Sequence, residues 1–370
     1  MMTELAIAGL GTALPNFPIA QSEVCDWLAN RLNYSNRTRR FAERIFRLSK
    51  VESRYSVLPD FTDPANSILY KDAPPTLEAR MKVFREEGPK LAERACNEAL
   101  RHAGFKSRDV THLIMITSTG FYTPGPDADL VKRMNLPSSI ERTVVSMGGC
   151  SAAFTGFRLA RQIVASDANA KILMACLELS SIHLDNDPNQ DNIIAYSVFG
   201  DACGAAVLTG ATDPNQAVAF LGNNRTHLDH DGRDLVTWDL KSTGYSISLS
   251  EELTPFIKER VADFVSPLVS TLTGGSEDPG NVPSWVVHPG GPSILRTIQI
   301  QLGLKETALE SAWEVLRDGG NLSSAAILFV LQRERFRREI GDEGILLGLG
   351  PGLTFESAAF SLGERAFDQL

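Results

Sequence analysis

The sequence predicts an α/β protein built as a layered αβαβα sandwich from two similar halves. Apolar strand-like segments alternate with helix-like segments, a pattern typical of parallel sheets that are buried on both faces. The same order of segments occurs twice, because Ile114 and Val286 are 172 residues apart, as are Met174 and Leu346. We therefore expect a duplicated βαβ-rich unit, with the first half at 1–210 and the second half at 211–370.

The composition is typical of a globular protein of enzyme size. The chain has 370 residues, of which 43% are hydrophobic, enough for one large or two ordinary domains. Its net charge of -9 disfavours a broad surface for nucleic acid. The five cysteines are scattered and form no Cys-x-x-Cys pair, which indicates cytosolic thiols and neither a disulfide framework nor a zinc site. No apolar run reaches the length of a membrane span, so we expect no integral membrane association. Together with the scattered cysteines and the negative net charge, this predicts a cytoplasmic protein without a nucleic-acid partner.

The first half contains a strand within residues 1–15, followed by a helix in GPKLAERACNEALRHAGF and a strand in HLIMITST. The β-branched segment ERTVV then predicts a strand that ends at a glycine turn before Cys150. A helix follows Cys150, and KILMACLEL predicts the next strand.

The second half repeats this order with different residues. The segment PFIKERVADFVSPLVSTL predicts a helix and SWVVHPGG a strand, and GGNLSSAAILFVLQRER and GILLGLG predict the next helix and strand. Cys150 and Asn321 are 171 residues apart, so they occupy the same strand–helix corner of the two halves. His288 follows a strand of the second half.

Cys150 lies in SMGGCSAAFTGF, where two glycines lead into a helix. The positive end of a helix dipole favours a thiolate, and glycines let a ligand or another backbone come close. This corner is therefore suited to a nucleophile. A free cysteine is more often a small buried apolar residue, and these residues alone leave both interpretations open.

His288 and Asn321 also have ordinary structural explanations, as a hydrogen-bonded loop histidine and as a helix N-cap. Each explanation is the more common one for a residue taken alone. Three such residues at related corners of a duplicated fold favour a shared functional site, because equivalent corners converge near the pseudo-dyad.

Six sequence blocks follow one another over most of the chain: THLIMITSTGFYTPG, MGGC, VFGDACGAAVL, VVHPGGPSIL, GNLSSAAILFVL and GLGPGLTFESAAF. In this order they resemble the type III polyketide synthases, the chalcone and stilbene synthase family, which has the thiolase fold. The resemblance implies a catalytic triad of Cys150, His288 and Asn321, and makes Phe199 one of two phenylalanines that gate the active site. It also implies a homodimer.

The chain departs from the plant enzymes of this family at several pocket positions. Without a gap, the second gating phenylalanine becomes Ser248, although one gap would bring Tyr245 to that position. The methionine that crosses the dimer becomes Thr123, and a cavity threonine becomes His183. Ser323 is expected to line the substrate pocket. The plant pocket is thus not preserved, and MGGC and TSTGFYTPG resemble bacterial members of the family.

Three arginines are candidates for binding coenzyme A. Arg40, Arg44 and Arg47 recur at spacings of four and three in RRFAERIFRLSK, so they share one face of a predicted helix. A solvated charged face explains the pattern equally well. The resemblance favours coenzyme A binding, with Arg44 the best aligned.

The resemblance implies iterative decarboxylative Claisen condensation of malonyl-CoA onto an acyl-CoA starter. We expect an aliphatic starter and cyclisation to a pyrone or resorcinol, with no metal and no cofactor beyond the coenzyme A thioester substrates. One alternative is a synthase of the 3,5-dihydroxyphenylacetyl-CoA type that uses malonyl-CoA alone. A priming ketoacyl-ACP synthase is a second alternative, although its histidine block usually reads HQAN. A non-catalytic acyl-CoA-binding scaffold is the third.

Overall fold

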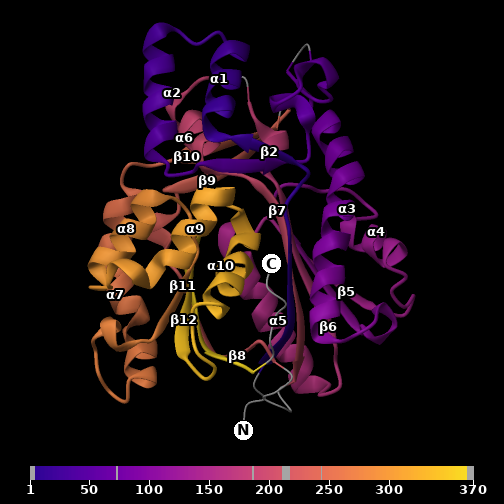
Figure 1. Ribbon diagram of the computed structural model, residues 1–370, viewed down its shortest axis with the longest axis vertical. Helices are drawn as coiled ribbons and strands as arrows, with labels where there is room; N and C mark the ends of the chain where they lie inside the picture. The colour runs from indigo at the N-terminus through magenta and orange to yellow at the C-terminus, as the bar shows by residue number, and fades with distance from the viewer. Residues whose placement is uncertain (1–4, 72–73, 186, 211–216, 243, 365–370) are drawn as a thin grey trace.

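The computed structural model describes residues 5–71, 74–185, 187–210, 217–242 and 244–364. Its main feature is a nine-stranded mixed sheet with the order β11-β12-β13-β8-β1-β7-β6-β4-β5 (Figure 1). The strands of this sheet are β1 (Leu5–Ala13), β4 (His112–Thr117), β5 (Glu141–Ser146), β6 (Ile172–Leu179), β7 (Asp201–Gly210), β8 (Ala219–Leu228), β11 (Ser284–Val287), β12 (Glu343–Gly350) and β13 (Thr354–Leu362). Two short antiparallel sheets of two strands each pair β2 (Phe17–Ala20) with β3 (Ser53–Ser56) and β9 (Val236–Lys241) with β10 (Gly244–Leu249).

Helices cover both outer faces of the sheet and fill the space between its two halves. In Figure 1, α5 and α10 lie in the middle, α3 lies on one side, and α7 and α8 lie on the other. The α-helices are α1 (Gln21–Arg31), α2 (Asn36–Leu48), α3 (Leu77–Ala103), α4 (Pro126–Arg133), α5 (Ala152–Ser166), α6 (Gln190–Val198), α7 (Leu253–Leu272), α8 (Pro292–Gln301), α9 (Glu310–Gly319) and α10 (Ala326–Arg335). This arrangement confirms the predicted layered α/β sandwich.

Strand β6 shows how the sheet is buried on both faces. Ile172, Met174 and Cys176 belong to the apolar cluster around α5 and α10, whereas the alternate residues Leu173 and Ala175 belong to the cluster under α3. Side chains alternate between the faces of a strand, so a continuously apolar strand needs a cover on each side.

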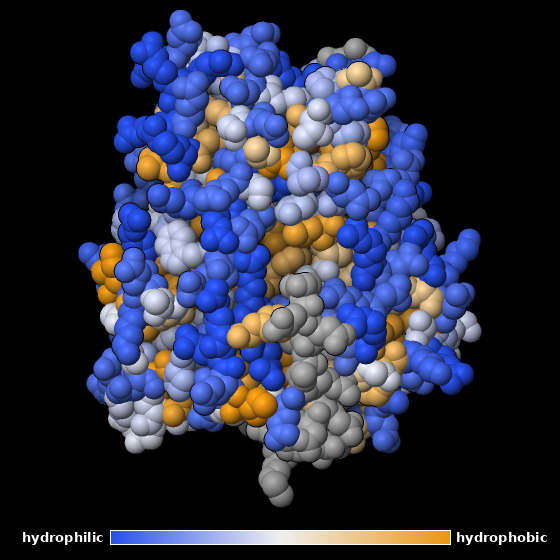
Figure 2. Space-filling model, viewed as in Figure 1, coloured by the Kyte–Doolittle hydropathy of each residue, from blue (hydrophilic) through white to orange (hydrophobic). Residues whose placement is uncertain are grey.

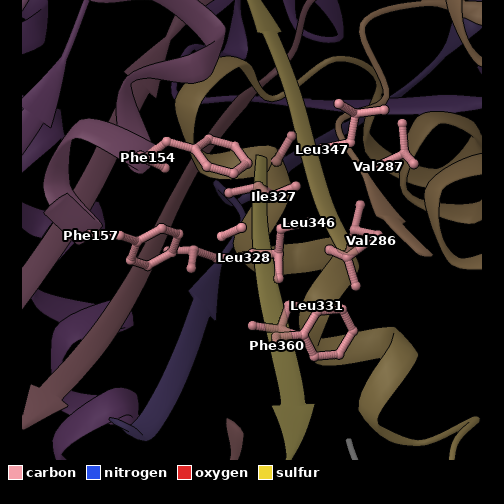
Figure 3. Packing of buried hydrophobic residues seen from close by; sticks show 14 of the residues in the cluster. Phe154, Phe157, Val286, Val287, Ile327, Leu328, Leu331, Leu346, Leu347 and Phe360 are labelled. Carbon is pink, nitrogen blue, oxygen red and sulfur yellow. The ribbon is translucent and has the colours of Figure 1, made fainter. Parts of the chain in front are cut away.

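The middle layer is held together by side chains that come from both halves. Figure 3 shows Phe154 and Phe157 of α5 beside Leu328 of α10 and Leu346 of β12. The shared core fixes the corners at which α5 and α10 begin.

The duplication predicted from the sequence is confirmed in the strand register. Ile114 of β4 pairs with Met174 of β6, and Val286 of β11 pairs with Leu346 of β12. The two pairs of residues separated by the constant sequence offset therefore make the same kind of parallel strand pairing in the two halves.

The expected parallel pairing is present in only part of the sheet, which is mixed. Parallel pairings join β4 to β5, β4 to β6 and β11 to β12, whereas β13 and β7 pair antiparallel with their neighbours. Only residues 351–353 separate β12 from β13, and so short a connection returns the chain antiparallel. Strand β1 also pairs with β8, which joins the two halves in one sheet.

The predicted boundary between the halves falls at 210/211, and residues 211–216 lie outside the described part of the chain. Among the helices that the structure describes, none combines the length and the apolar character needed to cross a membrane.

Candidate active site

One cavity brings together the three residues predicted to form the triad. Cys150, His288 and Asn321 all line a space of about 320 Å³, and Phe199 and Ser323 line it as well. The two 3₁₀ turns that precede the central helices, η4 (Gly149–Ser151) and η10 (Ser323–Ala325), contact one another beside it. The strand–helix corners at Cys150 and Asn321 therefore meet at one cavity, as the sequence predicts.

The glycine turn before Cys150 makes room for a neighbouring loop. Gly149 has φ +66, and a Cβ there would lie 2.5 Å from Cδ of Pro351. Pro351 stands in the turn between β12 and β13 and is itself a wall of the cavity. The Gly149 N–H also donates to Ser118 Oγ at 2.9 Å. Glycine is thus required both by the backbone angle and by the close approach of the second half.

Cys150 differs from the other cysteines in its surroundings. Its side chain is partly exposed, whereas Cys25, Cys96, Cys176 and Cys203 are buried. Desolvation by the surrounding protein raises the pKa of Cys150 to about 11, although hydrogen bonds from Ser323 and Asn321 act in the opposite direction.

His288 is held by its backbone, and its imidazole makes no hydrogen bond within the described part of the chain. Its N–H donates to the carbonyl of Leu347 at 2.8 Å, and its side chain is 2% exposed. Neither Nδ1 nor Nε2 has a hydrogen-bond partner among the described residues. Burial lowers the pKa of His288 to about 4, so the ring is neutral at pH 7. The two pKa values favour a protonated thiol and a neutral imidazole at pH 7, although a helix dipole by itself would favour a thiolate.

The Asn321 side chain is oriented by two hydrogen bonds. Its Nδ2 donates to the carbonyl of Gly290 at 3.1 Å, and its Oδ1 accepts from the Ser323 N–H at 2.9 Å. An amide nitrogen carries two hydrogens, so beyond the bond to Gly290 a second Nδ2–H is available for the hydrogen bond to Cys150 or for a substrate oxygen in its place.

A buried carboxyl group lies close to the thiol and was not predicted as part of the site. Glu178 accepts hydrogen bonds from the Ser118 N–H at 3.1 Å, Thr119 Oγ1 at 2.9 Å and Ser324 Oγ at 2.6 Å. Burial raises the pKa of Glu178, and its charge in turn raises the pKa of Cys150. The signal in the sequence was an acidic residue inside the otherwise apolar strand KILMACLEL.

Trp238 is a second aromatic wall residue that the sequence did not reveal. It packs against Phe199 with ring centroids 5.6 Å apart and an interplanar angle of 90°. Trp238 comes from β9, which pairs with β10, and no local pattern marked it as part of a pocket.

Ser248 does not line the cavity, so its prediction as a pocket residue is wrong. Its side chain is exposed, and Ser248 Oγ donates to Asp191 Oδ2 at 3.1 Å. Strand β10 presents alternate residues to opposite faces, and Tyr245 and Leu249 lie on the inner face. The alignment with one gap, which brings Tyr245 to the position of the second gating phenylalanine, thus places a residue of the buried face there.

The remaining predicted pocket residues have separate locations. Ser323 lines the main cavity, whereas His183 lines a smaller second cavity. Thr123 is exposed in the loop after β4, where it forms a cis peptide bond with Pro124, so its prediction as a pocket residue is not supported within this chain.

The three candidate arginines lie on the exposed surface of α2. Arg40, Arg44 and Arg47 are all exposed, and Arg40 Nε donates to the carbonyl of Asn36. The surface around α1 and α2 is mostly hydrophilic (Figure 2). These positions fit both a solvated face and an anion-binding face, so binding of coenzyme A stays a prediction.

No cluster of three or more His, Cys, Asp or Glu side chains suited to a metal ion occurs in the described ranges.

Comparison with known proteins agrees with the architecture and with the ordered sequence blocks. Residues 3–214 match the family model "Chalcone and stilbene synthases, N-terminal domain", and residues 225–361 match the corresponding C-terminal domain. A curated relative, "Probable polyketide synthase 1" of Dictyostelium discoideum, is 29% identical over 356 residues. That match covers 95% of this chain and 11% of the relative, so the chain spans about a tenth of the length of that protein.

Solved structures of similar proteins cover nearly the whole chain. PKS-I from the brown alga Ectocarpus siliculosus is 29% identical with a TM-score of 0.89, and the match covers 98% of this chain and 99% of that one. The C-terminal type III polyketide synthase domain of Steely1 from Dictyostelium is 26% identical with a TM-score of 0.89, with 97% and 99% of the two chains covered. Since the two family domains together match most of the sequence, the chain belongs to the chalcone and stilbene synthases, the family of type III polyketide synthases.

Proposed function

We propose that the chain catalyses iterative decarboxylative Claisen condensation of malonyl-CoA onto an acyl-CoA starter, with Cys150 as the acyl carrier. The observation that carries this proposal is the set of groups that meet in one cavity. A partly exposed thiol, an imidazole without a hydrogen-bond partner among the described residues, and an amide whose side chain interacts with that thiol all line the same space.

In the first step, Cys150 Sγ attacks the thioester carbonyl of the starter. The thiol proton passes to the neutral His288 ring, a C–S bond forms on Cys150, and coenzyme A leaves as a thiol with that proton. A neutral imidazole can accept a proton, so this step needs no preformed ion pair.

In the second step, the C–C bond to the carboxylate of malonyl-CoA breaks and CO2 leaves. The bonding electrons move to the thioester oxygen as an enolate, which accepts hydrogen bonds from Asn321 Nδ2–H and an N–H of His288. The apolar Phe199 ring disfavours the charged carboxylate relative to neutral CO2.

In the third step, the enolate carbon attacks the thioester on Cys150. A new C–C bond forms, the C–S bond to Cys150 breaks, and the extended chain leaves as a coenzyme A thioester. Transfer of this product back to Cys150 permits another extension.

The cavity walls favour an aliphatic starter and an alkyl pyrone or resorcinol as product. Val236, Leu249, Leu253, Ile257 and Ile294 line it, and each buried CH2 adds about 0.8 kcal/mol of binding. The leaning of the sequence toward bacterial members of the family stays a prediction.

One incubation tests this function. The enzyme is mixed with malonyl-CoA and a series of acyl-CoA starters, and the products are identified by mass spectrometry. We expect alkyl pyrones or resorcinols whose mass increases with the starter. Full turnover with malonyl-CoA alone, unchanged by added octanoyl-CoA or palmitoyl-CoA, would favour the synthase that uses only malonyl-CoA.

The same incubation distinguishes a polyketide synthase from a ketoacyl-ACP synthase and from an acyl-CoA-binding scaffold. Turnover that requires malonyl-ACP in place of malonyl-CoA would indicate a ketoacyl-ACP synthase. Binding of acyl-CoA without acylation of Cys150 and without product would indicate a scaffold.

We also propose that Arg40, Arg44 and Arg47 bind the phosphates of coenzyme A. Their shared exposed face on α2 supports this role. Arg44→Ala should raise the KM for coenzyme A thioesters several-fold without changing kcat, whereas the exposed Arg108→Ala serves as a control for lost charge. An unchanged KM in Arg44→Ala would contradict the proposal.

A homodimer is proposed from the exposed edge of the sheet. Strand β5 is the outermost strand, and Val144 within it and Met147 directly after it are 46% and 52% exposed. Edge strands with apolar side chains are usually covered by a partner. Sedimentation equilibrium at micromolar concentration should give the dimer mass, and a monomer would contradict this proposal.

A further inference from the structure

A buried arginine lies where the first half of the chain meets the corner at Asn321. Arg54 belongs to β3, and its side chain is 5% exposed. Its Nη1 donates to the carbonyl of Phe199 at 2.9 Å and also to the carbonyl of Tyr196. Because Nη1 carries two hydrogens, one nitrogen holds two carbonyl groups at the end of α6.

These carbonyls belong to the part of a helix that lacks internal partners. Helix α6 ends at Val198, and the last carbonyls of a helix receive no N–H from within it. The carbonyl of Val198 accepts from the Asn321 N–H at 2.6 Å, whereas those of Tyr196 and Phe199 accept from Arg54. A positive side chain at this end is also favoured by the helix dipole. Arg54 and the Asn321 corner therefore bind neighbouring peptide groups.

The surroundings of Arg54 do not favour its charge. Burial lowers the pKa of Arg54 to about 10, although the charge of Asp201 acts in the opposite direction. Among the described residues, Nε and Nη2 have no hydrogen-bond partner. The guanidinium lies over the ring of Phe46 of α2, with Cζ 5.6 Å from the ring centroid. A buried cation with incomplete hydrogen bonding lowers stability, so stability alone does not explain an arginine at this position.

Arg54 supports two groups that the proposed mechanism uses in the same step. Phe199 is the apolar wall that disfavours the malonyl carboxylate, and Asn321 is the donor to the enolate oxygen. A backbone bridge joins these two residues. Gly320, directly before Asn321, also lies close to the arginine, since a Cβ there would be 3.5 Å from Arg54 Cδ. A shift of the Phe199 carbonyl would therefore disturb both groups, whereas the proposed acylation of Cys150 uses neither.

We propose that Arg54 is a positioning residue for the decarboxylation step. Through the carbonyls of Tyr196 and Phe199, it holds the end of α6 against the Asn321 corner, so that the aromatic wall and the amide donor act on the same malonyl group. The proposal rests on the function proposed above. It adds a residue that lines the smaller second cavity and not the main one.

The test compares two half-reactions of one enzyme preparation. Release of CO2 from malonyl-CoA is measured without a starter, and acylation of Cys150 is measured with an acyl-CoA starter and without malonyl-CoA. The readout is the ratio of the first rate to the second. Arg54→Met removes the donors and should lower this ratio about tenfold, less than the 10²–10³ that loss of an oxyanion donor itself costs. Arg54→Lys keeps a charged donor and should give an intermediate ratio.

Arg80 provides the matched control, because it is another buried arginine that binds backbone carbonyls. It is 1% exposed and donates to the carbonyl of Ile182 and to that of Leu184 at 2.8 Å. The main cavity is lined by other residues. Arg80→Met and Arg80→Lys should lower the thermal stability, as the Arg54 variants do, but should leave the rate ratio unchanged.

Hydrogen exchange measured by mass spectrometry reports on the backbone bridge itself. Peptides that contain the amides of Gly200 and Asn321 should exchange faster in the Arg54 variants and at the wild-type rate in the Arg80 variants. If the methionine variants do not fold, Arg54→Lys and Arg80→Lys provide the same comparison of rate ratio and exchange.

A rate ratio that keeps its wild-type value in the folded Arg54 variants would overturn the proposal, even if hydrogen exchange becomes faster. An equal fall of the ratio in the Arg80 variants would also overturn it, because the effect would then follow from lost stability. A wild-type enzyme that neither acylates Cys150 nor releases CO2 is a different result, which would refute the proposed function itself.

Discussion

The backbones of Phe199 and Asn321 form a parallel β-bridge between the two halves of the chain. The Asn321 N–H donates to the carbonyl of Val198 at 2.6 Å, and the Gly200 N–H donates to the carbonyl of Asn321 at 3.1 Å. The bridge fixes an aromatic wall of the cavity and a proposed enolate donor relative to one another. Arg54 Nη1 strengthens it by donating to the carbonyl of Phe199 at 2.9 Å.

The role of Asn321 can be separated from that of Cys150. Asn321→Ala should still form the acyl thioester but should decarboxylate malonyl-CoA about a hundredfold more slowly, since loss of one oxyanion donor costs on the order of 10²–10³ in rate. Release of CO2 and acylation of the thiol are measured separately on the same sample. Normal decarboxylation by the variant would refute the assignment of Asn321 as a donor.

The protonation states of Cys150 and His288 predict how alkylation depends on pH. With the pKa of Cys150 raised to about 11 and that of His288 lowered to about 4, the thiolate fraction rises tenfold per pH unit across pH 6–9. The rate of Cys150 alkylation by iodoacetamide should rise with the same slope. A rate that is constant over this range would indicate a thiolate–imidazolium pair and would contradict the neutral state.

The turn at Gly149 is predicted to be intolerant of a side chain. Gly149→Ala places a Cβ against Pro351 in addition to the strain of φ +66, so Cys150 shifts and acylation should fall by about two orders of magnitude. Gly303 is the matched control, because it has φ +60 but nothing within 4 Å of its Cβ position.

Gly303→Ala should lower the thermal stability through backbone strain and leave acylation unchanged. Equal losses of acylation in the two glycine variants would show that the contact with Pro351 has no special role.

The size of the cavity should depend on Trp238 and not on Ser248. Trp238→Ala removes the ring that packs against Phe199 in the wall of the main cavity. The enzyme should then accept acyl chains that are several CH2 groups longer, and the product masses should increase accordingly. Ser248→Phe adds a ring on the exposed face of β10 and should leave the products unchanged. The product masses from a mixed series of starters test both variants, and a shorter chain limit in Ser248→Phe would show that β10 adopts the other face in solution.

Much of the site was predictable because it is encoded locally. A short-range sequence pattern marks each part of the site: the glycine turn before Cys150, the strand before His288 and the corner at Asn321. The repeated order of segments in the two halves indicates that these parts lie at equivalent places of the fold. The parallel pairings of Ile114 with Met174 and of Val286 with Leu346 are the physical basis of that offset.

The errors arise where long-range pairing decides which way a side chain points. Ser248 and Tyr245 lie on opposite faces of β10. Which of the two faces is buried depends on the pairing of β10 with β9 and on its packing against α6. Trp238 and Arg54 reach the cavities only through such contacts. Their roles therefore required the folded structure.

The central claim is that Cys150 carries the acyl group during condensation. The most direct measurement is peptide mapping by mass spectrometry after brief incubation with an acyl-CoA starter, with Cys150→Ala as the control. The account predicts the acyl mass on the peptide that contains Cys150 and its loss in the variant. Acyl mass on a peptide that contains Cys96 or Cys176, or labelling that survives in Cys150→Ala, would contradict it.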